Sequence, residues 1–284
     1  MTVGELLDQL AVTLVGPHVP PARADARDVI ASLLDKPRFW PSGNRALELD
    51  GVTEAAIRAA AARLMQGMPM QYAVGNAAFR HLTLAVDARV LIPRPETEVL
   101  VDLALMVSGG VGTIADICTG SGCIALALAA EGSYDRVIGT DLSADALEVA
   151  RGNLLAIPEE RRALVEFRQG DLLAPLQGER VRTIVSNPPY ISPAEAGALP
   201  AAVRDWEPHL ALFSDDDGMA AIRALVHGAP DVLQPGGVLL MEVDSTRARL
   251  VRDVLEGDPH YRGVEIRLDL TGRERFVVAR RKES

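Results

Sequence analysis

A strand-to-helix turn in the first half of the chain decides the fold. An apolar run, Thr113–Cys118, leads through Asp116-Ile117-Cys118-Thr119-Gly120-Ser121-Gly122 into a helical stretch, Cys123–Glu131. In an open α/β sheet a ligand binds at the carboxyl ends of the strands, and glycines there let the backbone pass close to it. The sequence therefore predicts a sheet with a ligand pocket at this turn.

Outward from the turn, short apolar runs alternate with helical stretches. The other expected strands are Arg136–Asp141, Leu164–Arg168, Thr183–Ser186, Gly237–Val243, Val264–Leu268 and Arg275–Ala279. The expected helices include Thr97–Val107, Ala144–Leu155 and Met219–Leu233. Such alternation is typical of an α/β fold, in which helices cover both faces of a parallel sheet. The last two runs flank a turn at Thr271-Gly272, which predicts an antiparallel hairpin at the edge of that sheet.

The beginning of the chain has a different pattern. Apolar residues recur at helical spacing at Leu6, Leu7, Leu10, Leu14, and again at Ala26, Val29, Ile30, Leu33, Leu34. Pro20-Pro21 should separate two helices, and Thr53 is the expected N-cap of a third, Glu54–Met65. Residues 73–93 partly alternate between apolar and polar, as in a β-hairpin. We therefore expect a helical domain at 1–72, a β-hairpin linker at 73–93 and the main domain at 94–284.

Composition limits the kinds of protein that this chain can be. The chain has 284 residues, 48% of them hydrophobic, and a formal net charge of −10, which disfavours a phosphate-coated partner. Neither a basic stretch followed by an apolar run at the start nor an apolar stretch long enough to span a bilayer is visible. Two cysteines, Cys118 and Cys123, and five scattered histidines lack metal-ligand spacing. We expect a cytoplasmic protein without a metal, a membrane or a direct nucleic-acid partner.

Three successive strand ends carry residues suited to a nucleoside. The third glycine of a dinucleotide fingerprint is missing after Gly120 and Gly122, which argues against NAD and FAD. Asp141 can accept hydrogen bonds from both ribose hydroxyls, although it can also cap the following helix. Asp171 can accept one from the adenine amine, with Leu172 against the ring. Each feature alone suits an ordinary turn or loop, but together they favour S-adenosyl-L-methionine.

Asn187-Pro188-Pro189-Tyr190, which closes the run Thr183–Ser186, suits a planar –NH2 group. The two prolines restrict the backbone and cannot donate hydrogen bonds. The Asn187 side-chain oxygen and the Pro188 carbonyl are then two acceptors at fixed separation, and Tyr190 offers an aromatic wall. A rigid turn is the alternative. The motif predicts methyl transfer to an amide or exocyclic amine, with Asn187, Pro188 and Tyr190 catalytic and Pro189 completing the substrate site.

Several motifs together resemble those of the release factor glutamine methyltransferases, a class I S-adenosylmethionine-dependent family. They are Gly67-Met68-Pro69-Met70-Gln71-Tyr72, Leu91-Ile92-Pro93-Arg94-Pro95-Glu96-Thr97-Glu98, Cys118-Thr119-Gly120-Ser121-Gly122, Ser186-Asn187-Pro188-Pro189-Tyr190-Ile191 and Gly272-Arg273-Glu274-Arg275. The resemblance implies a Rossmann-like, class I methyltransferase-type α/β fold, a seven-stranded sheet with a small N-terminal helical domain that docks the substrate and a β-hairpin linker. It implies N5-methylation of the glutamine in the Gly-Gly-Gln loop of class-1 peptide chain release factors, with S-adenosyl-L-homocysteine as product.

By motif position, the resemblance also implies the site residues. The cofactor would contact Cys118, Thr119, Gly120, Ser121, Gly122, Asp141, Leu172 and Asn187, and the glutamine would lie against Asn187, Pro188, Pro189 and Tyr190. Cys118 and Asp244 stand where the family often has glycine, and at Cys118 the chain is similar to a ribosomal-protein glutamine methyltransferase. That activity, a nucleic-acid adenine or cytosine amino-methyltransferase and a non-catalytic docking protein remain alternatives. We expect a monomer.

Overall fold

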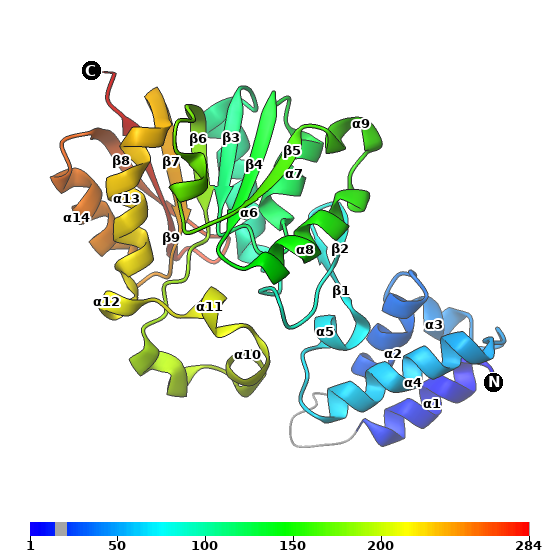
Figure 1. Ribbon diagram of the computed structural model, residues 1–284. Coiled ribbons are helices and arrows are strands. Elements are labelled where there is room, and N and C mark those ends of the chain that lie inside the picture. Colours follow the sequence, from blue (N-terminus) through cyan, green and yellow to red (C-terminus); the bar gives the residue numbers. More distant parts are fainter. Residues whose placement is uncertain (15–21, 284) are drawn as a thin grey trace. The chain divides into compact units, whose positions relative to one another are not determined.

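The computed structural model describes residues 1–14 and 22–283, and they fall into two compact units (Figure 1). Unit 1 is Met1–Asn76 with Pro200–Trp206, and unit 2 is Ala77–Leu199 with Glu207–Ser284. The expected break at Pro20-Pro21 lies outside the described residues.

Unit 1 is helical. Its helices are α1 (Val3–Thr13), α2 (Ala22–Leu33), α3 (Trp40–Gly43), α4 (Gly51–Met65), α5 (Met70–Val74) and α10 (Ala201–Trp206). The leucines of α1 pack against the apolar side chains of α2 and α4 in one core. The expected N-cap Thr53 is wrong, because the Asp50 carboxylate accepts from the backbone N–H groups of Val52 (2.9 Å) and Thr53 (2.8 Å), so α4 begins earlier.

Unit 2 contains a seven-stranded sheet among its described residues, as expected. In spatial order the strands are β5 (Val165–Gln169), β4 (Arg136–Asp141), β3 (Thr113–Ile117), β6 (Val181–Ser186), β7 (Leu233–Glu242), β9 (Glu274–Arg281) and β8 (Tyr261–Leu268). The first five are parallel, whereas β9 runs antiparallel to both β7 and β8. The carboxyl ends of the parallel strands therefore meet at one edge.

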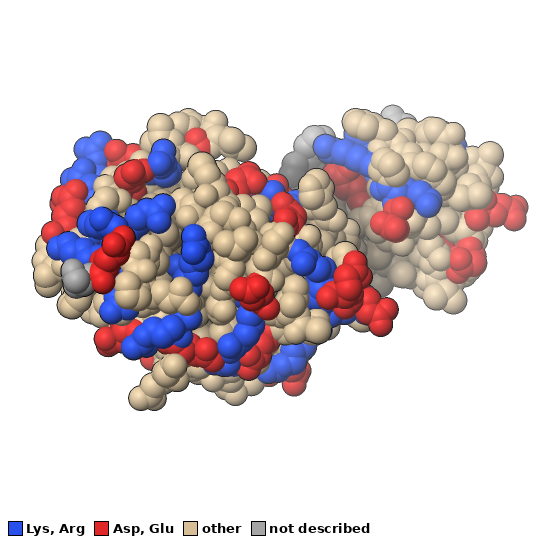
Figure 2. Space-filling model, turned by 90° about the horizontal axis from the view of Figure 1, so that it is seen from above, with Lys and Arg blue, Asp and Glu red and all other residues tan. Residues whose placement is uncertain are grey.

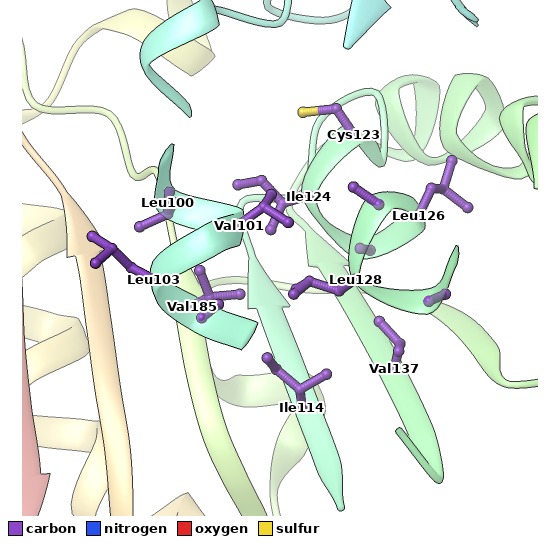
Figure 3. Packing of buried hydrophobic residues seen from close by; sticks show 14 of the residues in the cluster. Leu100, Val101, Leu103, Ile114, Cys123, Ile124, Leu126, Leu128, Val137 and Val185 are labelled. Atoms are coloured by element: carbon purple, nitrogen blue, oxygen red, sulfur yellow. The ribbon is translucent and has the colours of Figure 1, made fainter. Parts of the chain in front are cut away.

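Helices cover both faces of this sheet. On one face, α6 (Pro95–Ser108) and α7 (Cys123–Glu131) pack onto β3, β4 and β6 (Figure 3). On the other face lie α13 (Ala220–Val232) and α14 (Ala248–Gly257). Nearly every side chain of α7 is buried, which explains why its sequence is apolar all round. These two buried layers hold the strand ends in place.

A two-stranded sheet, β1 (Asn76–Phe79) and β2 (Leu82–Ala85), precedes α6. Its Phe79, Leu82 and Leu84 are buried in the same cluster as α6 and α7. Both strands lie within the stretch expected to be a β-hairpin, and its turn is Arg80-His81.

The remaining elements are short. They are α8 (Ala144–Gly152), η1 (Asn153–Ala156), α9 (Glu159–Arg162), η2 (Ala174–Leu176), η3 (Pro193–Ala198), α11 (His209–Leu212) and α12 (Asp215–Gly218). None of the helices in the described ranges is long and apolar enough to cross a lipid bilayer.

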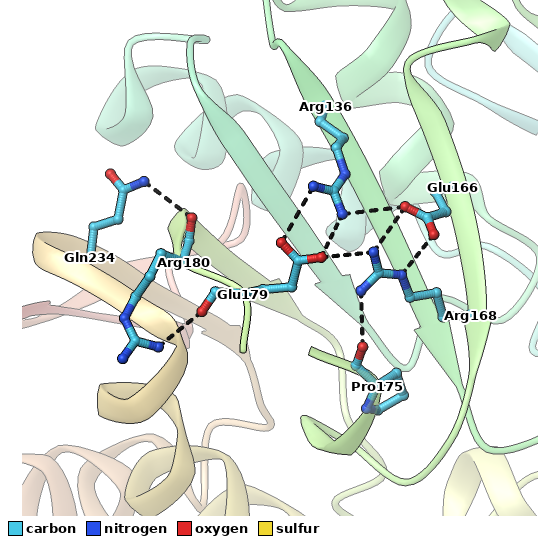
Figure 4. A network of polar contacts seen from close by, with 7 residues as sticks. All are labelled: Arg136, Glu166, Arg168, Pro175, Glu179, Arg180 and Gln234. Carbon is cyan, nitrogen blue, oxygen red and sulfur yellow. Dashed lines mark hydrogen bonds and ion pairs between the residues drawn. The ribbon is translucent and has the colours of Figure 1, made fainter. Parts of the chain in front are cut away.

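An ion network ties β4 and β5 to the chain that enters β6 (Figure 4). Glu179 accepts from Arg136 (2.7 Å) and Arg168 (2.8 Å), and Arg168 also pairs with Glu166 (2.8 Å). These arginines hold the pKa of Glu166 and Glu179 below the usual range. On the face of unit 2 drawn in Figure 2, basic and acidic side chains are interleaved, without a continuous field of one sign.

Candidate active site

A cavity of about 680 Å³ opens at the carboxyl edge of the parallel strands, within unit 2. The strand ends supply Cys118, Gly120, Thr140, Asp141, Leu142, Ser143, Asp171, Leu172, Asn187 and Pro189. The rest of the lining comes from residues 88–91, from Pro208, Leu210, Ala211, Phe213, Ser214 and Asp215, and from Asp145, Ala146, Ala220, Ala221 and Ala224. A cavity of this size can enclose a small-molecule cofactor.

The loop after β3 is held open by left-handed backbone. Cys118, Gly120 and Gly122 have φ values of 63°, 54° and 81°. Gly120 lines the cavity, and a Cβ added there would meet no protein atom within 4 Å, so this stretch of backbone is open to a ligand. Gly122 instead faces the side chains of Ala150 and Phe167, both 3.2 Å from such a Cβ, and does not line the cavity.

Asp116, in β3, holds the same loop in place through two hydrogen bonds. It is fully buried, and its Oδ2 accepts from the Thr119 hydroxyl (2.6 Å) and from the backbone N–H of Ala125 in α7 (3.1 Å). Burial raises the pKa of Asp116 to about 7. Thr119 and Ser121, both expected at the cofactor, are buried and do not line the cavity.

Asp141 faces the cavity with its carboxylate partly engaged by backbone. Its Oδ2 accepts from Gly120 N–H (2.8 Å) and its Oδ1 from Ser143 N–H (2.9 Å). The helix α8 is capped by Ser143, whose hydroxyl accepts from Ala146 N–H (3.1 Å), so Asp141 is not needed as a cap. Burial raises the pKa of Asp141. A carboxylate has about four acceptor positions, so two remain for ligand hydroxyls.

The lining of the cavity is acidic. It contains the four carboxylates of Asp141, Asp145, Asp171 and Asp215 but one cationic side chain, Arg89. Arg89 is itself paired with Asp87 (2.7 Å) and Glu148 (3.3 Å), neither of which lines the cavity. The cavity therefore favours a cationic ligand and disfavours a pyrophosphate.

The Asn187 carboxamide has a defined orientation at the edge of the cavity. Its Nδ2 donates to the Thr97 hydroxyl (3.3 Å), which leaves Oδ1 free. No described residue donates a hydrogen bond to Asn187 Oδ1 or to the Pro188 carbonyl. Two unpaired acceptors at adjacent positions match the two N–H bonds of a planar –NH2 group.

Tyr190 is part of the wall behind the motif. It packs against the α13 and α14 cluster and does not line the cavity, and burial raises the pKa of its phenol to about 12. Its carbonyl lies against Gly218, where an added Cβ would come within 2.1 Å of that oxygen. Ile191 N–H then donates to Leu212 O (3.0 Å), and Ser214 N–H to Ile191 O (2.9 Å). These two hydrogen bonds join the motif to the segment that contains Phe213 and Ser214, which line the cavity.

Several residues at the site were assigned no role from the sequence. Glu207 is buried and joins the start of α6 to the cavity wall, because it accepts from Ile92 N–H (3.2 Å) and pairs with Arg94. Thr97, which accepts from Asn187, and Glu242, at the end of β7, are also buried. Their positions follow from the packing of α6 over β6 and β7, which local sequence does not reveal.

Comparison with known proteins gives the family. Residues 96–202 match the methyltransferase small domain. A release factor glutamine methyltransferase from Moorella thermoacetica is 38% identical over 294 aligned residues that cover all of both chains. The chain belongs to the release factor glutamine methyltransferase family. Another member, from Cereibacter sphaeroides, is 44% identical, and the alignment covers 80% of this chain and 78% of that protein.

A solved structure supports the same fold. The methyltransferase from Pyrococcus furiosus superposes with a TM-score of 0.53 at 18% identity, covering 73% of this chain and 92% of its own. As a family member the protein is a methyltransferase, and its cofactor is S-adenosyl-L-methionine. The open Gly120, the free acceptor positions of Asp141 and the acidic lining all fit that cationic sulfonium. Cys118, which stands where the family often has glycine, has a φ of 63° that glycine adopts without strain.

The described residues contain no group of three or more His, Cys, Asp or Glu side chains that could hold a metal ion.

Proposed function

We propose that the protein methylates the side-chain amide nitrogen, N5, of the glutamine in the Gly-Gly-Gln loop of class-1 peptide chain release factors. The observation that carries the proposal is a pair of unpaired acceptors on neighbouring residues, Asn187 Oδ1 and the Pro188 carbonyl. Asn187 lines the acidic cavity, whereas Pro188 is buried and does not line it. The family relatives, named for this activity, support the choice of substrate.

We assign the cofactor-binding role to the cavity residues. Asp141 would accept from the ribose hydroxyls, Asp171 from the adenine amine, and Leu172 would contact the ring. When bound, S-adenosyl-L-methionine supplies an electrophilic methyl group on a sulfonium. Cys118 and Gly120 would border the cofactor directly, whereas Thr119, Ser121 and Gly122 would act by shaping the loop.

The chain's own contribution to the reaction is orientation. An amide nitrogen is a poor nucleophile because its lone pair is delocalised into the carbonyl. If Asn187 Oδ1 and Pro188 O accept both N–H bonds, the nitrogen is held in one place and its emerging lone pair points in one direction. Such positioning can supply up to about 7–11 kcal/mol of barrier reduction. The proton is lost late, to water, so no strong base is required.

The test is transfer of labelled methyl from S-adenosyl-L-methionine to a purified release factor. Label should enter the wild-type factor and not a variant with Ala in place of the loop glutamine. Asn187→Ala should bind the cofactor with unchanged affinity and turn over at least about 100-fold more slowly. A wild-type rate from Asn187→Ala would exclude the proposed clamp.

The same assay separates the alternatives. Label on a ribosomal protein would favour the ribosomal-protein glutamine methyltransferase, and label on DNA or RNA the nucleic-acid enzyme. Neither the acidic cavity nor the interleaved charges in Figure 2 favour contact with a phosphate backbone, which argues against the nucleic-acid enzyme. We also propose that the helical residues 1–72 help dock the protein substrate, and that the enzyme works in the cytoplasm as a monomer.

A further inference from the structure

One buried side chain joins two backbone segments that lead into the lining of the cavity. Asn153, at the start of η1, is 4% exposed and does not line the cavity itself. Its Oδ1 accepts from Ala85 N–H (2.7 Å). Its Nδ2 donates to the Ala85 carbonyl (3.0 Å) and to the Ser121 carbonyl (3.0 Å). A single carboxamide therefore makes three hydrogen bonds to backbone groups that lie far apart in the sequence.

Both segments continue directly into the cavity. Ala85 is the last residue of β2, and the chain beyond it supplies residues 88–91 of the lining. Ser121 belongs to the loop after β3 and follows Gly120, whose backbone is open to a ligand. The Asn153 side chain thus fixes one part of the lining relative to another.

The Asn153 carboxamide matches its partners in one orientation. An –NH2 group has two protons to donate, which suit the two carbonyls, and the amide oxygen suits the N–H. Aspartate at this position would place a second oxygen against both carbonyls. Leucine has a similar shape but can neither donate nor accept. Each replacement would leave buried backbone groups without a partner, which is costly.

We propose that Asn153 is a positioning residue for the cofactor, which holds the loop after β3 and residues 88–91 at the separation that S-adenosyl-L-methionine requires. This inference rests on the cofactor-binding role proposed above, because the cavity must hold the cofactor. Asn153 touches no ligand and acts through the backbone of its two partners. Without it, only a fraction of the molecules keeps both walls in place, and the apparent Kd rises by the inverse of that fraction.

Two variants remove the three hydrogen bonds in different ways. Asn153→Asp and Asn153→Leu should each raise the Kd of S-adenosyl-L-methionine and of S-adenosyl-L-homocysteine about 10- to 100-fold in calorimetry, as expected if about 1–10% of the molecules remain competent. Leucine carries no charge, so its effect on both ligands reports position and not charge. A Kd within threefold of wild type in Asn153→Leu would overturn the proposal.

Ser108→Ala is the matched control for stability. The Ser108 side chain is 1% exposed and also makes three hydrogen bonds, with the Ala104 carbonyl (2.7 Å), the Tyr134 hydroxyl (2.8 Å) and Gly110 N–H (3.0 Å). None of these residues lines the cavity. Ser108→Ala should lower the midpoint of urea unfolding, as the Asn153 variants should, yet leave both Kd values within about twofold of wild type. Equal weakening of binding in Ser108→Ala would show that lost stability is the cause, and would overturn the proposal.

Hydrogen exchange tests the same contact in the unaltered enzyme. Ala85 N–H is bonded to Asn153 Oδ1, so its exchange requires this contact to open. Gly110 N–H, bonded to the Ser108 hydroxyl, is the reference away from the cavity. Bound S-adenosyl-L-homocysteine should slow exchange at Ala85 at least about tenfold more than at Gly110. Equal slowing at both amides would refute a link between Asn153 and the cofactor.

Asp141→Asn keeps this inference separate from the proposed function. If Asp141→Asn weakens cofactor binding and neither Asn153 variant does, the cavity is assigned correctly and the role of Asn153 is refuted. If the Asn153 variants weaken binding and Asp141→Asn does not, the role of Asn153 holds and the ribose contact of Asp141 is refuted. If none of the three weakens binding, the cofactor lies elsewhere and both fail. None of these measurements needs a release factor, so the choice of protein substrate is tested independently.

Discussion

Replacing Asp141 by Asn should weaken cofactor binding by about 10- to 150-fold. In the structure the carboxylate already accepts from Gly120 N–H (2.8 Å) and Ser143 N–H (2.9 Å), and its remaining acceptor positions are those we assign to the ribose. Asparagine keeps one acceptor oxygen and replaces the other with a donor. Loss of one hydrogen bond to a charged acceptor costs about 1.5–3 kcal/mol, which gives this range of Kd.

Isothermal titration calorimetry with both S-adenosyl-L-methionine and S-adenosyl-L-homocysteine measures this effect. Both ligands carry the same ribose, so Asp141→Asn should weaken them by similar factors. Asp145→Asn is the control, because it removes a carboxylate from the same lining without a proposed ribose contact. It should change either Kd by less than about threefold, as expected for a solvent-screened charge.

Two results would contradict this reasoning. If Asp141→Asn binds both ligands within twofold of wild type, Asp141 does not hold the ribose. If it weakens the sulfonium ligand at least tenfold more than the neutral product, Asp141 acts through its charge.

Three further changes have outcomes that follow from the structure. Gly120→Ala, at a φ of 54° beside the cavity, should cost about 1–2 kcal/mol of stability and reduce cofactor affinity in calorimetry. Its control Gly152→Ala, in helical backbone with open space, should stabilise by about 0.5–1 kcal/mol in urea unfolding. Asp244→Gly removes the acceptor of Thr246 N–H and Arg247 N–H (both 2.9 Å) and a partner of the Arg247 guanidinium, 7% exposed, so it should lose about 2–4 kcal/mol in the same assay. Glu242 has a raised folded pKa, so the folded state binds its proton more tightly, and stability should fall by about 3 kcal/mol as pH rises from about 4.5 to about 7. Unfolding curves at several pH values should show this slope in wild type and a flatter one in Glu242→Gln.

The strands and helices with continuous apolar sequence were predictable. The bounds of β4 (Arg136–Asp141) and α7 (Cys123–Glu131) coincide with those expected, because turn residues end each apolar run. The helix α14 was not expected, since Ala248, Val251 and Leu255 alone form its buried side among charged neighbours. Pro235-Gly236-Gly237 resembles a turn in sequence, yet it belongs to β7, which begins at Leu233. There pairing with β6, in which Leu233 lies opposite Val181, overrides the local preference.

Residues at the strand ends were predictable as a group, since parallel strands finish at a common edge. Their roles toward ligands stay predictions. The partner of Asn187 was not predictable, because Thr97 is brought to it by the position of α6 over β6 and β7. Asp244, a departure from the family glycine, gains an explanation from the structure: its carboxylate holds the start of α14 and Arg247, which reaches the Asp217 carbonyl (2.9 Å).

Two buried carboxyl groups lie on the α6 and α7 face of the sheet at a cost in stability. Asp116 and Glu242 each have one oxygen without a partner among the described residues, and burial raises the pKa of each to about 7. An apolar side chain at either position would remove that cost. At Asp116 it would also remove the acceptor that holds Thr119 and the α7 N-terminus. Since these contacts shape the loop that we assign to the cofactor, this destabilising group lies where backbone orientation matters to the proposed reaction.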